Sequence, residues 1–323
     1  MTTRELLRQI NNTSLILRWL MVTGLDHLYM LGKEEPAITS RIDGDVVPGS
    51  MEHLCVFSHY DRDDRIDDYV VYYLEQLYSL GCETVLVSTS KTLDGTSMDK
   101  ARPYCRRIIV RENRGYDFGS WKVGLQDVGN LSSYNTLVLA NDSVYGPIRD
   151  LKDVFHEMRS HGYAAWSITD SLEIRYHLQS YFLVLEKAVL DSPEFADFWD
   201  NLPSYSFKRS VIWNCEIGFS QRLLRAGFAL GALCAYGKLR EEHLDAVLST
   251  EKQQHLSGPV NPSHRLWRLL AKSYRCPFLK VDLLRDNPEN LEDVNQWSAV
   301  IQESSHYDTD LIRHHLARMN AGR

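Results

Sequence analysis

The chain has 323 residues, of which 44% are hydrophobic and 24% are charged, a composition typical of a globular protein that buries a substantial core. Its length allows one large α/β domain with additions or two smaller domains. The formal net charge is −7 and no long run of lysine and arginine is present, which argues against a nucleic-acid partner.

The first 50 residues are expected to form one or two helices and then a loop over residues 35–50, where proline, glycine and aspartate are frequent. Residues 15–31 are rich in apolar side chains, but Arg18 and Asp26 make them too polar to span a membrane, and we expect no signal peptide here. The favoured interpretation is an amphipathic helix that packs on protein. The alternative is one that lies on a membrane surface.

The six cysteines are widely separated, and none forms a Cys-x-x-Cys pair. They lie at positions 55, 82, 105, 215, 234 and 276. This spacing does not fit a zinc site and is sparse for a secreted disulfide scaffold. Cys55 and Cys82 fall in or beside apolar strand-like runs, where a free thiol acts as a small hydrophobic side chain. The cysteines therefore favour a reducing cytoplasm.

Apolar runs and helical periodicity alternate along the chain after residue 50. Strands are predicted over residues 54–58, 84–87, 107–110, 137–140, 163–168 and 180–185. Helices are predicted before Gly81, from the 113–119 segment to about Gln126, over 150–160 and over 221–226. This order is typical of an α/β fold with a single, mostly parallel and doubly wound sheet. Ligands bind outside the carboxyl ends of such strands, so the polar residues found there are the candidates for function.

His59, Tyr60 and Asp61 follow the first predicted strand. The acidic segment 61–68 does not fit an EF-hand, because its sixth and twelfth positions are isoleucine and tyrosine instead of glycine and glutamate. The simpler interpretation is a solvated loop and helix start. In the functional alternative, the three residues contact a nucleotide base.

Residues 113–119, Asn-Arg-Gly-Tyr-Asp-Phe-Gly, lie between a predicted strand and a predicted helix. Gly115 would let backbone N–H groups approach a phosphate at the helix N-terminus, with Asn113 and Asp117 beside it. The segment lacks both the Gly-x-Gly-x-x-Gly dinucleotide pattern and the Gly-Lys-Ser/Thr of a P-loop. The alternative is that Asp117 simply caps the helix.

The fourth predicted strand ends in Asn141, Asp142 and Ser143, shortly before the forced turn at Gly146-Pro147. A carboxylate at this place can hold a hard cation or a substrate hydroxyl. The alternative is an Asx turn, in which Asp142 binds its own backbone.

Glu216 has apolar neighbours on both sides and precedes the predicted helix 221–226. It is either a first-turn carboxylate favoured by the helix dipole or a carboxylate suited to take a proton from an acceptor hydroxyl. Farther along, His264 could ligate a metal from a C-terminal segment that folds back, although a lone histidine usually has no such role.

Taken together, these segments resemble the rhamnan-synthesis F family of bacterial polysaccharide glycosyltransferases. The matching blocks are Phe-Ser-His-Tyr-Asp at 57–61, Arg-Glu-Asn-Arg-Gly-Tyr-Asp-Phe-Gly at 111–119, Ala-Asn-Asp-Ser-Val-Tyr-Gly-Pro at 140–147 and Cys-Glu-Ile-Gly-Phe-Ser at 215–220, with 277–280 and 283–288 near the end. The resemblance spans roughly residues 53–290. It implies an A-type nucleotide-diphospho-sugar transferase fold, in which one continuous α/β sheet binds donor and acceptor. We therefore divide the chain into an N-terminal extension (1–50), a glycosyltransferase domain (51–290) and a C-terminal helical tail (291–323).

The resemblance implies transfer of a sugar, L-rhamnose by the family's name, from a nucleoside-diphosphate donor to a lipid-linked, growing cell-surface polysaccharide such as lipopolysaccharide O-antigen. Such transfer takes place in the cytoplasm at the inner face of the membrane, where residues 1–50 would dock on the bilayer or on an assembly protein. Two rivals share this sheet. One is a non-catalytic sugar- or nucleotide-binding module, and the other is a sugar-phosphate nucleotidyltransferase, which the lack of a glycine-rich, basic N-terminal loop disfavours.

The chemistry of transfer suggests the roles. As the sugar leaves, negative charge builds on the diphosphate and must be met by positive groups or N–H donors. The 113–119 turn and Lys122 are candidates, with a Mg²⁺ or Mn²⁺ ion at Asp142. Metal-dependent members of the fold usually carry Asp-x-Asp, so an ion here would also need the donor diphosphate and His264. Glu216 is the expected base of an inverting reaction. The expected donor contacts are His59, Tyr60, Asp61, Asn113, Gly115, Asp117, Lys122, Asn141 and Ser143, with Asp142 catalytic.

Overall fold

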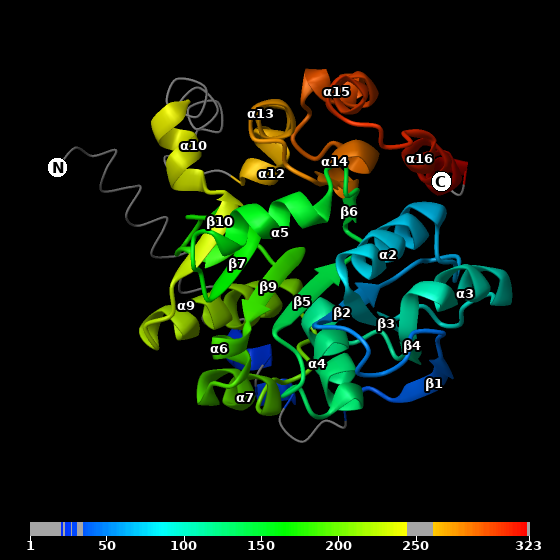
Figure 1. Ribbon diagram of the computed structural model, residues 1–323, viewed down its shortest axis with the longest axis vertical. Helices are drawn as coiled ribbons and strands as arrows, with labels where there is room; N and C mark the ends of the chain where they lie inside the picture. Colours follow the sequence, from blue (N-terminus) through cyan, green and yellow to red (C-terminus); the bar gives the residue numbers. More distant parts are fainter. Residues whose placement is uncertain (1–20, 22, 27, 31–34, 244–260, 322–323) are drawn as a thin grey trace.

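The computed structural model describes residues 21, 23–26, 28–30, 35–243 and 261–321. Within this part of the chain, nine strands form one sheet in the order β1-β4-β3-β2-β5-β9-β7-β10, with β8 beside β7 (Figure 1). Their bounds are β1 Ile38–Asp43, β2 His53–His59, β3 Cys82–Ser88, β4 Cys105–Arg111, β5 Thr136–Asn141, β7 Ala165–Ser171, β8 His177–Leu178, β9 Phe182–Glu186 and β10 Leu230–Cys234. Strands β4, β3, β2 and β5 run parallel, as do β7 and β10, whereas β1 and β9 are antiparallel to their neighbours. The expected single, mostly parallel α/β sheet is confirmed.

Helices cover both faces of the sheet, because side chains alternate between the faces along each strand. In β2, Cys55 and Phe57 join one apolar cluster, and Leu54 and Val56 join the other. Helices α2 (Asp68–Leu80), α3 (Gly95–Ala101) and α5 (Leu151–Arg159) contribute to the first cluster. The second cluster is covered by α4 (Tyr116–Val128), α6 (Lys187–Leu190), α7 (Pro193–Asp200), α8 (Lys208–Val211) and α9 (Gly218–Arg225). The single turn η1 (Arg102–Tyr104) leads into β4.

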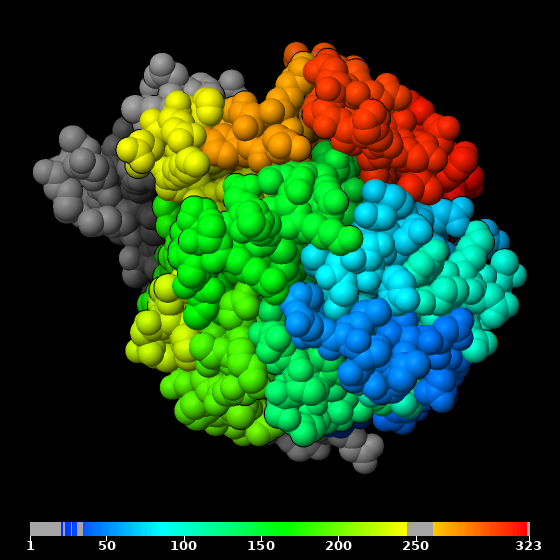
Figure 2. Space-filling model, in the orientation of Figure 1, coloured from blue at the N-terminus to red at the C-terminus, as the bar shows by residue number. Residues whose placement is uncertain are grey.

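The C-terminal part of the described chain, from Tyr236 on, packs over α5 and α2, where the orange and red segments lie in Figures 1 and 2. Its elements are α10 (Tyr236–Glu242), α12 (Pro262–Arg265), α13 (Trp267–Ser273), β11 (Leu279–Lys280), α14 (Val281–Asp286), η3 (Glu292–Gln296), α15 (Trp297–Ser304) and α16 (Asp310–Ala321). Val300, Ile301 and Ile312 belong to the same apolar cluster as α2 and α5. Residues 291–321 are therefore helical as expected, but they are part of the main core rather than a separate tail.

Two other expectations need correction. The predicted loop 35–50 contains strand β1, which is half-exposed at the edge of the sheet and pairs with β4. An edge strand with polar side chains on its open face carries a weak apolar signal, so its composition resembled that of a loop. The helix predicted over 221–226 begins much earlier, because α8, the π-helical turn η2 (Ile212–Ile217) and α9 follow one another without a break.

The cysteines behave as the sequence predicts. All six are buried and free. Burial also raises the pKa of Cys82 and Cys105 above the usual value for a thiol. They therefore act as small apolar side chains. No helix within the described residues is both long and apolar enough to cross a bilayer.

Candidate active site

The carboxyl ends of β2 and β5 place several of the predicted residues side by side. The two strands are adjacent and parallel, and Ser58 pairs with Asn141 in their register. The residues that follow the two strands, His59 to Asp61 and Asn141 to Ser143, therefore meet at one edge of the sheet. Helix α4 begins at the same edge and adds Asp117 in its first turn.

A chain of hydrogen bonds connects these elements. Asp117 Oδ1 accepts from the Ser58 hydroxyl at 2.8 Å, and Asp117 Oδ2 accepts from Asn141 Nδ2 at 3.0 Å. Asn141 Oδ1 in turn accepts from the backbone N–H and the hydroxyl of Ser143, at 3.1 and 2.5 Å. Asp117 does not cap α4, where Gly115 occupies the cap position. Burial raises the pKa of Asp117, against these hydrogen bonds. Its carboxyl holds the ends of β2, β5 and α4 together.

Asp142 lies on the open side of this network. Its Oδ2 accepts the backbone N–H of Tyr60 at 2.8 Å, and its carbonyl accepts the Tyr69 hydroxyl at 3.0 Å. Burial and, to a smaller extent, the nearby Asp117 raise the pKa of Asp142 to about 8. His59 Nε2 is 4.0 Å from Asp142 Oδ2, but burial lowers the pKa of His59 to about 4. The pair is therefore not an ion pair at neutral pH, and an incoming positive charge would favour the ionised form of Asp142.

Glu216 reaches the same edge of the sheet from the opposite direction. Strand β9 is antiparallel to β5, and Phe182 at its start pairs with Ala140 at the end of β5. Just before β9, the backbone N–H of Ser180 donates to Glu216 Oε1 at 2.8 Å. Glu216 sits in the π-helical turn η2, eight residues after Lys208 begins the helical run. The expected position at a helix start is therefore wrong, and the helix dipole does not account for this carboxylate.

Lys280 completes the edge, although the sequence assigned it no role. Strand β11 pairs with β6 (Val144–Tyr145), which places Lys280 beside Val144, two residues after Asp142. Its ammonium lies 4.2 Å from the centre of the Tyr181 ring. Ser58, Ser180 and Lys280 could all have been suspected, because the first lies in the 57–61 block, the second begins a predicted strand and the third ends the 277–280 block.

Lys122 and His264 are not brought to this group. Lys122 Nζ donates to Glu35 and to the Leu202 carbonyl, both at 2.8 Å. His264 Nε2 instead pairs with Asp282 Oδ1 at 2.9 Å, which lowers the pKa of Asp282 to about 2 although burial opposes the shift. The structure therefore gives both side chains partners other than Asp142.

The predicted glycine-rich approach to a phosphate is only partly supported. Gly115 has a φ of +87°, as a turn glycine should. A Cβ at this position would meet Gly119 Cα and Ser204 Cα, both at 3.3 Å, so protein fills the space next to it. Asn113 is exposed at the start of the turn. Packing against Ser204 and the positive φ therefore explain this glycine without a ligand, and approach of a phosphate to the backbone N–H groups stays a prediction.

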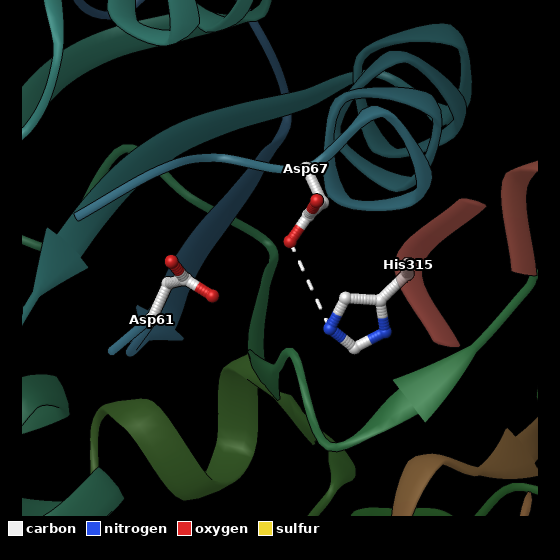
Figure 3. Close-up of side chains that lie close together, drawn as sticks. All are labelled: Asp61, Asp67 and His315. Atoms are coloured by element: carbon white, nitrogen blue, oxygen red, sulfur yellow. Dashed lines mark ion pairs between the residues drawn. The ribbon is translucent and has the colours of Figure 1, made fainter. Parts of the chain in front are cut away.

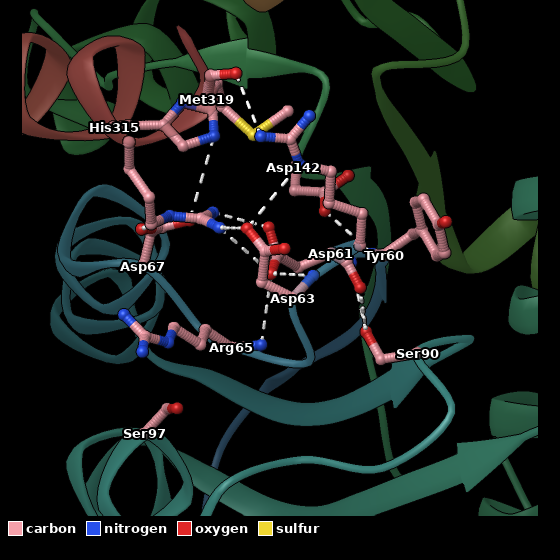
Figure 4. A network of polar contacts seen from close by, with 12 residues as sticks. Tyr60, Asp61, Asp63, Arg65, Asp67, Ser90, Ser97, Asp142, His315 and Met319 are labelled. Carbon is pink, nitrogen blue, oxygen red and sulfur yellow. Dashed lines mark hydrogen bonds and ion pairs between the residues drawn. The ribbon is translucent and has the colours of Figure 1, made fainter. Parts of the chain in front are cut away.

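Asp61, Asp67 and His315 form a second polar group close by, with ligand atoms within 4.8 Å of one another (Figure 3). Arg318 from α16 occupies this group and pairs with Asp61 at 2.5 Å, and with Asp63 and Asp67. Figure 4 shows these three carboxylates near Asp142 and His315. Burial favours a higher pKa for Asp61, but Arg318 keeps it below its usual value. A guanidinium already supplies the positive charge here, so this group fastens α16 to the loop after β2.

Comparisons with known proteins agree with the sequence blocks. Residues 84–323 match the family described as Rhamnan synthesis protein F. The chain is 36% identical over 167 residues to the uncharacterized protein y4gN of Sinorhizobium fredii, which covers 50% of this chain and 43% of that protein. It is 31% identical over 201 residues to virulence protein VirA of Vibrio anguillarum, covering 57% and 64%. The chain thus spans less than two thirds of either relative.

Among solved structures, the mannosyltransferase PcManGT from Pyrobaculum calidifontis in complex with GDP-Man and Mn²⁺ aligns with 98% of this chain and 91% of its own. The sequence identity is 12% and the TM-score is 0.40.

Proposed function

Because this chain belongs to the rhamnan synthesis protein F family, we propose that it is a glycosyltransferase that uses a nucleoside-diphosphate sugar. One structural observation supports this most strongly. Asp142 follows β5, and Glu216 is held just before the neighbouring antiparallel strand β9, so two carboxyl groups from distant parts of the sequence meet at one sheet edge. One can face a leaving diphosphate and the other an attacking hydroxyl.

The donor diphosphate is proposed to bind beside Asp142, where α4 begins. A single carboxylate of the Asn-Asp-Ser triplet fits a Mg²⁺ ion, because Mg²⁺ in such sites takes one or two carboxylates together with substrate phosphates. A bound Mg²⁺ or Mn²⁺ would offset the charge that develops on the leaving diphosphate. His59 and Tyr60, which flank Asp142, are the proposed contacts to the rest of the donor.

Glu216 is proposed as the base that removes a proton from the acceptor hydroxyl in an inverting transfer. The Ser180 N–H fixes Oε1, and among the described residues Oε2 receives no hydrogen bond. Oε2 is therefore the oxygen that can accept the proton. Helices with a π-turn often carry functional residues, and η2 brings Glu216 toward β9.

We further propose that the sugar is L-rhamnose and that the acceptor is a lipid-linked glycan such as O-antigen. The description of the family, rhamnan synthesis, supports the sugar and a polysaccharide acceptor. Nucleotide sugars are cytoplasmic, which supports the location. The enzyme would then act in the cytoplasm at the inner face of the membrane, with residues 1–50 as the docking segment.

The test is release of nucleoside diphosphate when the protein is incubated with dTDP-rhamnose, GDP-mannose or a UDP-hexose and a lipid-linked acceptor. Acceptor-dependent release from one of these donors is expected. Binding without release would identify a non-catalytic sugar- or nucleotide-binding module. Formation of a nucleotide sugar from a sugar phosphate and a nucleoside triphosphate would identify a nucleotidyltransferase.

A further inference from the structure

Lys280 is fixed at the boundary between the donor and acceptor halves of the site. The backbone N–H of Val281 donates to the carbonyl of Ser143 at 2.9 Å, and β11 pairs with β6. These main-chain bonds attach Lys280 to the segment that carries Asp142. Its ammonium, in contrast, lies over the Tyr181 ring, one residue after the Ser180 N–H that holds Glu216.

The ammonium has carboxylates around it, but among the described residues it has no hydrogen-bond or ion-pair partner besides its contact with the Tyr181 ring. The charges of Asp282, Glu216 and Asp117 act on Lys280, in decreasing order, and among the described residues none of the three forms an ion pair with it. Asp282, the next carboxylate, is engaged by His264 at 2.9 Å. Lys280 is partly buried, and its three N–H donors are left for a ligand that carries acceptor oxygens.

We propose that the Lys280 ammonium binds the diphosphate of the sugar donor and stabilises its charge as it leaves. This inference rests on the proposed function, since it requires a nucleoside-diphosphate donor beside Asp142. Lysine suits the task because its three N–H donors can follow phosphate oxygens as the bond to the sugar breaks. The aromatic face of Tyr181 holds the cation in place without competing as a hydrogen-bond acceptor.

The position of Lys280 also explains why the Asn-Asp-Ser triplet can meet the charge of the diphosphate with a single carboxylate for the metal ion. A second positive group next to the phosphates reduces the charge that an ion at Asp142 must offset. Lys280 is far from the triplet in the sequence, and the pairing of β11 with β6, together with the Val281 N–H bond to Ser143, brings it there. In the competing explanation, Lys280 acts on Glu216 and adjusts its basicity without contacting the donor.

The experiment compares binding of dTDP, GDP and UDP with binding of the matching nucleosides, by calorimetry, in Mg²⁺ and in EDTA. The variants are Lys280→Met, Lys280→Arg and Lys238→Met, a control lysine on the exposed side of α10. Lys280→Met should lower the affinity for the nucleoside diphosphate on the order of 10–100-fold, because hydrogen bonds to charged groups are strong. Nucleoside affinity should not change, Lys280→Arg should retain most of the diphosphate affinity, and Lys238→Met should match the wild type.

Equal diphosphate affinity in Lys280→Met and the wild type would overturn the assignment and leave the proposed function standing. A parallel fall of nucleoside and diphosphate affinities would overturn it in the same way. A shifted pH profile of turnover with unchanged diphosphate affinity would overturn the assignment and show that Lys280 adjusts the basicity of Glu216. If the wild type binds none of the nucleoside diphosphates, the proposed function itself is overturned and this inference with it.

Discussion

The backbone N–H of Ser180 donates a 2.8 Å hydrogen bond to Glu216 Oε1 across 36 positions of the sequence. The bond joins the start of β9 to the π-helical turn η2 and orients the carboxylate toward the edge where Asp142 and Lys280 lie. A backbone donor is preferable to a side chain for this purpose, because it has no rotamers to search. The relationship fixes the proposed acceptor side of the site, as the Tyr60 N–H bond to Asp142 fixes the proposed donor side.

Gly115→Val should destabilise the folded protein and not only weaken binding of the sugar donor. The residue has a φ of +87°, and an added Cβ would meet Ser204 and Gly119. Strain of this kind costs about 1–3 kcal/mol, and overpacking adds a similar amount. We expect the free energy of unfolding to fall by at least about 2 kcal/mol in denaturant titrations.

Gly129→Val is the matched control, because Gly129 also has a positive φ but nothing lies within 4 Å of its would-be Cβ. It should cost only the strain of its backbone conformation, about 1–3 kcal/mol. If both variants lose the same stability, contact with Ser204 contributes nothing. In that case Gly115 is again a candidate for direct approach to the diphosphate.

Asp142→Asn should abolish transfer, and chelation by EDTA should have the same effect on the wild type. Asparagine keeps the shape of the side chain but cannot take the negative charge that a Mg²⁺ ion requires. The measurement is turnover by product release, with Mn²⁺ and Mg²⁺ added back after EDTA. If activity survives EDTA but not the substitution, Asp142 is needed for transfer and a metal ion is not. Asp142 would then hold a sugar hydroxyl.

Much of the fold could be predicted because its central strands are long apolar runs. Strands β2, β3 and β5 are buried on both faces and lie within a residue or two of their predicted ends. Strand β1 was missed because its residues alternate between half-buried and exposed positions at the sheet edge. Short strands such as β6 and β11, with two residues each, leave no periodicity to detect.

Site residues that directly follow a predicted strand could be predicted from the sequence. Site residues that a distant segment contributes could not. Asn141, Asp142 and Asp117 meet as expected, because parallel neighbours end at one edge. Lys280 depends on a distant strand pairing, which a single sequence does not reveal. Lys122 does not join Asp142, because its position, two turns into α4, carries it to Glu35 instead.

His315 should make stability depend on pH. Its Nδ1 lies 2.7 Å from the Tyr145 hydroxyl, and burial, together with Arg318, lowers its pKa from 6.5 to about 4. The unfolded chain therefore binds a proton more readily than the folded one, so stability is lost as the pH falls from 6.5 toward 4. At pH 5 the loss from this group is about 1–2 kcal/mol relative to pH 8.

The check is the free energy of unfolding at pH 8, 6 and 5 for the wild type, His315→Gln and His314→Gln. His314 is the exposed neighbour and serves as control. The wild type and His314→Gln should lose stability more steeply than His315→Gln between pH 6 and 5. Parallel curves for all three proteins would show that protonation of His315 does not oppose folding.

Residues 1–50 should not bind membranes by charge. They contain no basic cluster, and Asp26 accepts the backbone N–H groups of Ser206 and Phe207 at 3.2 and 3.3 Å, which attaches this segment to protein. Flotation with anionic liposomes should therefore show little binding at low salt. Strong binding that salt abolishes would contradict this view and point to an electrostatic anchor.

Glu216→Gln tests the central claim, that this carboxylate is the base of a glycosyl transfer. The amide keeps the shape and can still accept the Ser180 N–H, but it cannot take a proton. Turnover should fall on the order of 10²–10⁴-fold, the usual contribution of a general base, while donor affinity measured by calorimetry on the same preparation stays unchanged. Turnover within a few-fold of the wild type, or a parallel fall in donor affinity and turnover, would contradict the account.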